Sequence, residues 1–139
     1  MKHKYLKHLV KGIQALAAAS PAPSAGNVNG TAIDLVAQPE CFAGIVLINV
    51  GAPTGTPSSF SVTYKLQTST DNFSTDTTDV ASVVATAAGM THIPFDPNGL
   101  SRYVRVRREL TFVGGTSPTL PDCAILVLGD PKYGPLAGV

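Results

Sequence analysis

The stretch Arg102–Phe112, RYVRVRRELTF, alternates between apolar and polar residues along its length, and this pattern constrains the fold more than any other in the chain. On one face of a strand with this period lie the apolar side chains of Val104, Val106, Leu110 and Phe112. On the other face lie Tyr103, Arg105, Arg107, Glu109 and Thr111. We expect the first face to enter a core and the second to present positive charge. The pattern leaves open whether Arg107 or Arg108 points inward, because a bulge would reverse the register there.

The chain from residue 31 onward repeats this behaviour in short strands separated by loops rich in Gly and Pro. The other predicted strands are Thr31–Ala37, Phe42–Val50, Phe60–Thr68, Val80–Ala87, Met90–Phe95 and Cys123–Leu128. This spacing predicts an all-β, antiparallel sandwich. An eight-stranded jelly roll fits it best, and an immunoglobulin-like sandwich is the second choice because the chain has no Trp.

One predicted strand is apolar throughout. Phe42–Val50, FAGIVLINV, carries no charge and one polar residue, Asn49. A run of this kind predicts a central strand that is either covered on both faces or placed at a subunit contact.

The N-terminal segment is basic. Residues 1–33 hold four Lys and no acid, which leaves six basic against nine acidic residues in the remainder. Residues 4–18 have helical spacing, so we expect a short amphipathic helix. Residues 20–30, SPAPSAGNVNG, are interpreted as a linker. The predicted division is therefore a basic arm and linker at 1–30 and a sandwich domain at 31–139.

The arm and the charged face of the 102–112 strand are the candidate partner-binding parts of the chain. Charged residues make up only 14% of the sequence, below the roughly 25% of an ordinary soluble protein. A weakly charged surface suits extended contact with a partner. The candidate partner-binding residues are Lys4, Tyr5, Leu6, Leu9, Ile13, Arg105 and Arg107.

The sequence shows no catalytic motif, and we expect no enzyme activity, cofactor or metal site. His92 has no companion for acid–base chemistry in the predicted domain. Asp71, Asp76 and Asp79 lack the spacing of a calcium loop, so ordinary turn chemistry is expected. Cys41 and Cys123 are expected to be free, buried thiols.

Nucleic acid and membranes are not expected as partners. Aromatic residues near the Arg-rich strand are few, and residues 34–139 are net acidic. No segment reaches the roughly 18 consecutive apolar residues of a membrane span. The N-terminus imitates a signal peptide, although Lys7 and Lys11 interrupt its apolar part.

Four segments, in order, carry a family resemblance: FAGIVLINVGAPTG, VTYKLQTSTDNFSTDTTDV, SRYVRVRRELT and CAILVLGDPKYGP. They contain a Leu-x-x-Ser-x-Asp segment with an aromatic residue soon after it (Leu66–Phe73), an Arg-Tyr-Val-Arg-Val strand (Arg102–Val106) and a Leu-Gly-x-Pro ending (Leu128–Pro131). Over residues 42–135 the chain resembles the capsid decoration or cement proteins of tailed bacteriophages, which are encoded beside the major capsid protein.

The resemblance implies a non-enzymatic protein on the outer surface of a virion, present in the host cytoplasm during assembly. Its partner would be the major capsid protein, which it would bind as a homodimer or homotrimer. The alternative is a secreted carbohydrate-binding or adhesin-type sandwich. That protein would use the signal-like N-terminus and an exposed pair of aromatic rings.

Overall fold

The computed structural model describes residues 10–18, 23–38 and 40–131. Its elements are β1 (Val10–Leu16), β2 (Gly26–Asn29), β3 (Ile33–Asp34), the 3-10 helix η2 (Leu35–Ala37), β4 (Cys41–Val50), β5 (Ser59–Ser69), β6 (Thr78–Ala85), β7 (Gly89–Phe95), the 3-10 helix η3 (Pro97–Gly99), β8 (Tyr103–Val113) and β9 (Asp122–Pro131).

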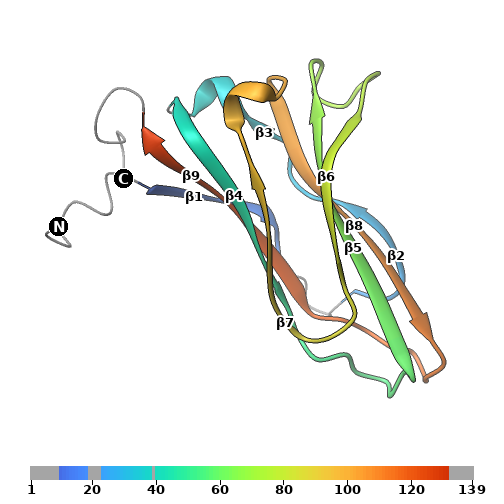
Figure 1. Ribbon diagram of the computed structural model, residues 1–139. Coiled ribbons are helices and arrows are strands. Elements are labelled where there is room, and N and C mark those ends of the chain that lie inside the picture. Colours follow the sequence, from blue (N-terminus) through green and yellow to red (C-terminus); the bar gives the residue numbers. More distant parts are fainter. Residues whose placement is uncertain (1–9, 19–22, 39, 132–139) are drawn as a thin grey trace, which may run out of the picture.

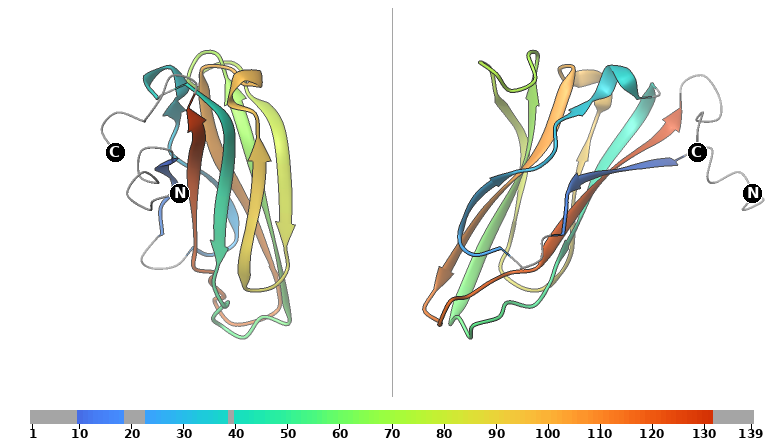
Figure 2. Two further views of the ribbon diagram at one scale, coloured as in Figure 1. Left: turned by 60° about the vertical axis from the view of Figure 1, so that its left-hand side comes forward. Right: turned by 180° about the vertical axis from the view of Figure 1, so that it is seen from behind.

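The strands form two antiparallel sheets that pack face to face, as the turned views in Figure 2 show. Sheet A has the order β1-β9-β4-β7, and sheet B has the order β2-β8-β5-β6, with β3 also paired to β8. The all-β sandwich predicted from the sequence is confirmed.

The pairing is nested around the β5–β6 hairpin. Moving outward from it, β4 pairs with β7, β2 and β3 pair with β8, and β1 pairs with β9. Two further pairings, β4 with β9 and β5 with β8, join the halves of this long hairpin when it is rolled into two layers (Figure 1). A long hairpin rolled in this way has the topology of a jelly roll.

The core lies between the sheets and is built from alternate residues of four long strands. Sheet A contributes the aliphatic side chains of Val46, Ile48, Leu126 and Leu128. Sheet B contributes Val62, Leu66, Val104, Val106 and Leu110. All of them are at most 1% exposed. Burial of each such side chain is worth about 1.5–3 kcal/mol, which explains why the period-two pattern fixes the inward faces.

The predicted helix over residues 4–18 is wrong for residues 10–16, which form β1 along one edge of sheet A. A helix this short would be marginal in water, whereas pairing with β9 gives the backbone hydrogen-bond partners and buries Ala15 and Leu16. Strand β2 lies inside the predicted linker. Both strands precede residue 31, where the sandwich was expected to begin, and residues 1–9 lie outside the described ranges.

A buried ion pair links the two sheets. Arg108 is on the inner face of β8 and only 2% exposed. Its Nη1 donates to Oδ1 of Asp122 in β9 at 3.1 Å, and the hydroxyl of Tyr64 in β5 donates to Oδ2 of the same carboxylate at 2.6 Å. Burial and then this bond raise the pKa of Tyr64 well above its usual range. The structure thus decides which arginine points inward, and it does so without a bulge between β8 and β5.

Neutralising Asp122 should be costly, because it would leave the Arg108 charge buried without a counter-charge. We expect Asp122→Asn to lower the free energy of unfolding by about 3–5 kcal/mol, as measured by urea denaturation. The Nε of Arg108 has no hydrogen-bond partner among the described residues, so the network is incompletely satisfied. The triple variant Arg108→Met, Asp122→Leu, Tyr64→Phe should therefore come close to wild-type stability. A cost below about 1 kcal/mol for the single variant would contradict this role.

Candidate interaction surfaces

The outer face of sheet B carries most of the predicted positive charge. Its side chains project from β5, β6 and β8 in neighbouring register positions. We call this surface the paired face and define it by Lys65, Gln67, Asp79, Arg105, Arg107 and Glu109.

Each cation on the paired face has a partner within the domain. Lys65 Nζ lies 3.1 Å from a Glu109 carboxylate oxygen and 3.4 Å from one of Asp79. Arg107 Nε donates to Glu109 at 3.0 Å, and Arg105 Nε donates to the side-chain oxygen of Gln67 at 2.9 Å. With three cations against two carboxylates, the face is nearly neutral and offers little to a polyanion.

On this face the contacts of Lys65, Asp79 and Glu109 favour the ionised forms of these three side chains. Hydrogen bonds from Lys65 and then Arg107 lower the pKa of Glu109. Gln67, followed by the charge of Lys65, lowers the pKa of Asp79. The pKa of Lys65 is raised, chiefly by its bond to Glu109.

The β5–β6 loop is held by two aspartates. Asp71 accepts the backbone N–H groups of Ser74 at 3.1 Å and Thr75 at 2.8 Å, as well as the Thr75 hydroxyl. Asp76 accepts both the N–H and the hydroxyl of Thr70. Bonds led by that from Thr75 hold the pKa of Asp71 well below its usual range. The predicted turn chemistry is confirmed, since these carboxylates are engaged by hydrogen-bond donors of their own loop.

Two aromatic rings near the Arg-rich strand are occupied by arginines. The Arg105 guanidinium lies 4.0 Å from the centre of the Phe73 ring, and that of Arg102 lies 4.9 Å from the Tyr103 ring. Arg102 also makes a bidentate pair with Asp34, with a shortest distance of 2.7 Å. These rings are therefore not free platforms for stacking a sugar or a base.

The outer face of sheet A has the opposite character. Its outward residues form four rows of cross-strand neighbours. Two rows run across β1, β9, β4 and β7: Gly12–Val127–Ile45–Pro94 and Gln14–Ile125–Leu47–His92. Two shorter rows flank them: Cys123–Asn49–Met90 on β9, β4 and β7, and Gly129–Ala43 on β9 and β4. We call these four rows the apolar face.

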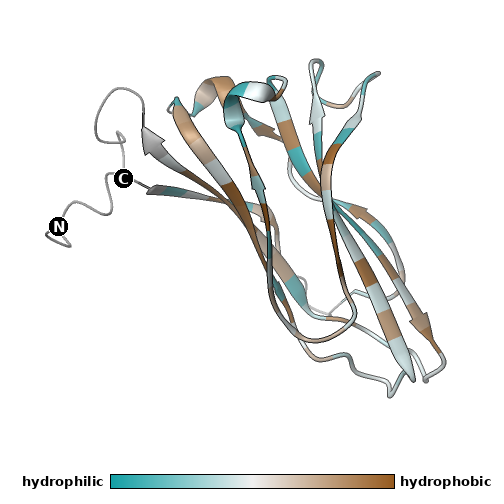
Figure 3. Cartoon of the chain, viewed as in Figure 1, coloured by the Kyte–Doolittle hydropathy of each residue, from teal (hydrophilic) through white to brown (hydrophobic). Residues whose placement is uncertain are grey.

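No residue of the apolar face carries a formal charge with His92 neutral, and Leu47 and Ile125 at its centre are 38% and 45% exposed. Figure 3 shows β4 coloured as hydrophobic along most of its length. The inner side of β4 packs on the core, while its outer side is uncovered by any described element. The described residues therefore cover only one face of this strand, and the predicted subunit contact on its other face stays a prediction.

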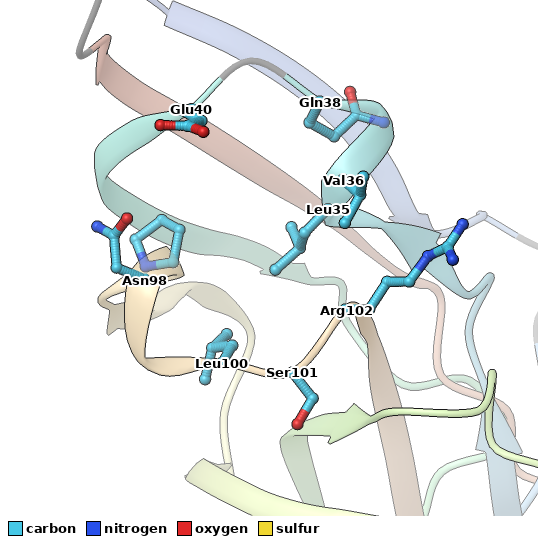
Figure 4. A pocket seen from close by; sticks show the side chains of 9 residues that line it. Leu35, Val36, Gln38, Glu40, Asn98, Leu100, Ser101 and Arg102 are labelled. Carbon is cyan, nitrogen blue, oxygen red and sulfur yellow. The ribbon is translucent and has the colours of Figure 1, made fainter.

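A hollow of about 390 Å³ lies at the end of the sandwich where η2, η3 and the start of β8 meet. In Figure 4, Glu40 and Asn98 stand on one side of it, and Val36 and Arg102 on the other. Arg102 is committed to Asp34, and Asn98 donates to Asp96 and to the Cys41 carbonyl. No sequence motif marks this hollow, because segments distant in the sequence, 35–40 and 97–102, form it together.

The structure separates the predicted partner-binding residues. Arg105 and Arg107 lie together on the paired face, whereas Ile13 lies in β1 and packs partly against the core. The other four, at positions 4, 5, 6 and 9, lie outside the described ranges and stay predictions. The outward residues of the apolar face were not chosen from the sequence, although the uncharged run Phe42–Val50 was the available signal.

The described residues give no sign of a metal centre or a membrane helix. They contain no cluster of three or more His, Cys, Asp or Glu side chains able to hold a metal ion. None of their helices has the length and hydropathy needed to cross a membrane. His92 is exposed on the apolar face. Among the described residues Cys41 and Cys123 form no disulfide, and of the two only Cys41 is fully buried.

No protein family and no curated protein matches the sequence. Among solved structures, the chain is similar to the PBSX exported protein XepA, with a TM-score of 0.63 and 14% identity. The match covers 88% of this chain but only 38% of XepA, so the chain spans well under half of that protein. At this identity the likeness shows a shared fold and nothing more.

Two further likenesses to solved structures are weaker, with TM-scores below 0.5. One is to a structure of Bacillus endospore appendages, described as disulfide-linked pili, at a TM-score of 0.49 with 9% identity over 89% of this chain and 90% of that one. The other is to the VP2 subviral particle of infectious bursal disease virus, at 0.46 with 10% identity over 89% of this chain and 33% of that one.

Arg105 should stabilise the fold by bracing the β5–β6 loop. We expect Arg105→Ala to lower the free energy of unfolding by about 1–2 kcal/mol, since it removes a hydrogen bond and a cation–π contact. Arg107→Ala is the matched control and should cost less than about 1 kcal/mol, because Lys65 still pairs with Glu109. Equal effects of the two substitutions in urea denaturation would show that the Phe73 contact adds nothing.

Acid should destabilise the protein in a defined pH window. The folded pKa values of Asp71, Asp79 and Glu109 lie below their ordinary values, so the stability that they contribute is fully present above about pH 5 and is lost as pH falls through the folded values. We expect the midpoint of thermal unfolding, followed by circular dichroism, to fall progressively below about pH 4. Asp71→Asn should flatten this decline, and a midpoint that rises with acid would contradict the assignment.

Proposed function

We propose that this chain is a non-enzymatic structural protein of a virus particle. In this proposal it binds the outer surface of a phage capsid through the apolar face of sheet A and holds neighbouring major capsid subunits together. The observation that carries the proposal is the absence of charge from the four rows of the apolar face.

The geometry of the apolar face suits a flat protein contact. The strands lie about 4.8 Å apart, and the outward residues span about 20 Å along β4 and β9 but less along β1 and β7, which makes a surface on the order of 400 Å². Uncharged surfaces of this size on soluble proteins commonly mark interaction sites. The paired face differs from it, because the charged side chains there already have partners within the domain. In the proposal, sheet A is therefore the sheet that binds a partner.

The size of the apolar face also fits a protein that acts in many copies. A stable, specific interface needs roughly 800 Å² from each partner, about twice what this face supplies alone. A single copy would therefore bind weakly. Many copies bridging subunits of one shell would act together, since each contact holds the neighbouring ones in place.

The family resemblance supports the choice of a capsid as the partner. Its three motifs fall on β5 and the β5–β6 loop, on β8, and on β9. Two of them meet through the contact of Arg105 with Phe73, so these motifs brace one loop of the jelly roll. This contact gives two of the motifs a shared structural role, and in the proposal the apolar face supplies the surface for capsid contact.

Charging the apolar face should abolish capsid binding while leaving the fold intact. The experiment mixes the full chain with capsids assembled from the tailed-phage major capsid protein of the same genome, which the proposal requires, and measures co-sedimentation. We expect saturable binding of the wild type at a stoichiometry set by capsid symmetry. Leu47→Asp should weaken binding at least about tenfold, because a charge would have to be desolvated.

The matched control adds a charge to the opposite side of the sandwich. Thr111 is an exposed residue of β8 in sheet B, so Thr111→Lys should bind as the wild type does. Unchanged binding of a folded Leu47→Asp variant would overturn the role of the apolar face. No binding by the wild type would overturn the proposed function itself.

A deletion that tests the predicted anchoring role of the arm has to be shorter than the predicted arm and linker, residues 1–30, because β1 lies within them. Removing residues 1–9 leaves β1 whole, whereas a deletion through residue 20 would also remove an edge strand of sheet A. We expect the shorter deletion to weaken capsid binding and to leave thermal unfolding unchanged. Wild-type affinity in that variant would show that Lys4, Tyr5, Leu6 and Leu9 do not anchor the protein.

A further inference from the structure

Each sheet of the sandwich ends in two edge strands, and an edge strand exposes unpaired backbone groups to any other strand that can reach them. The edges of sheet A are β1 and β7, and those of sheet B are β2 and β6. Soluble proteins protect such edges with short strands, Pro, Lys, Gly or bulges. The four edges of this protein differ in how far they follow that rule.

Three of the edges are protected. Strand β1 carries Lys11 and Gly12, and its register shifts near Leu16. Strand β7 carries Pro94, which has no N–H to donate. Strand β2 is only four residues long.

The fourth edge, β6, lacks these devices over most of its length. It runs for eight residues, TDVASVVA, without Pro, Gly or Lys. Its one charge, Asp79, lies near the start and is engaged by Gln67 and Lys65. The register irregularity opposite Leu66 and Gln67 falls at the same end, so the pairing of Ala81–Ala85 with β5 is regular.

The side chains of β6 also favour pairing with another strand. Val80 and Val84 are 41% and 57% exposed, and Val83 on the inner side is only partly buried. Residues of this β-branched type pack well across neighbouring strands. Among the described residues, no backbone group outside β5 bonds to this strand.

We propose that β6 pairs antiparallel with β6 of a second copy of this chain, joining two sheets B into one continuous sheet. A second copy fits better than a free strand of another protein because it brings an equally long, equally unprotected edge. In any register within Ala81–Ala85, only Ala, Ser and Val face one another, so no like charges meet. An antiparallel pairing of identical strands is also self-complementary, as a twofold dimer requires.

This interface is separate from the apolar face, because β6 belongs to sheet B and the apolar face to sheet A. The dimer would therefore leave both apolar faces free. Dimerisation and capsid binding can be measured independently, and either can fail without the other.

Sedimentation equilibrium of the full chain over a wide range of concentration tests the proposal. We expect a reversible monomer–dimer equilibrium in the wild type. Val84→Lys should weaken dimerisation at least about tenfold, since each copy would place an added positive charge close to the twofold axis. Val113→Lys is the matched control, because Val113 is a similarly exposed valine of sheet B that lies away from β6, and it should dimerise as the wild type does.

Amide hydrogen exchange provides a second readout that locates the contact. Amides of Ala81–Ala85 that point away from β5 should exchange rapidly in dilute monomer and slowly in dimer. A wild type that is monomeric at every concentration would overturn the proposal, as would unchanged dimerisation of a folded Val84→Lys variant. Loss of the dimer in Leu47→Asp but not in Val84→Lys would also overturn it and place the contact on the apolar face.

Discussion

The buried charge of Arg108 constrains the sandwich more tightly than any apolar contact in it. An apolar side chain can repack against many neighbours, but a buried guanidinium needs a carboxylate at hydrogen-bond distance. Asp122 meets this need from the opposite sheet, and Tyr64 fixes the second oxygen of the same carboxylate. The network joins β8 and β5 of sheet B to β9 of sheet A and so fixes the position of one sheet relative to the other.

With the sheets fixed, the two outer surfaces become physically different. The paired face of sheet B satisfies its own charges and braces the β5–β6 loop through Arg105 and Phe73. The apolar face of sheet A has no such internal arrangement. The basic strand that looks in sequence like a binding surface therefore has its arginines engaged within the domain, while the uncharged strand β4 is the surface that the proposed function uses for contact.

The sequence allowed the long strands and their inward residues to be predicted, because alternation reports burial directly. It did not identify β1, since Leu9, Ile13 and Leu16 fit a helix and the pairing with β9 that decides otherwise is remote in sequence. The inward direction of Arg108 follows the parity of Val104, Val106 and Leu110, yet the reason that a charge is tolerated there is Asp122 on another strand. The apolar face escaped prediction because it arises only when β4 and β9 lie side by side.

The nested pairing has a consequence for how the chain reaches this structure. The β5–β6 hairpin closes a short loop, whereas β1 must meet β9 across nearly the whole described chain, from Val10 to Gly129. Loop closure costs more entropy as the closed segment lengthens, so we infer that pairing spreads outward from the hairpin and that β1 joins last. Pulsed hydrogen exchange during refolding that protected β1 before β5 would refute this order. Among the described elements β1 pairs as a strand with β9 alone, so its release from this edge would leave every other strand pairing of the sandwich in place.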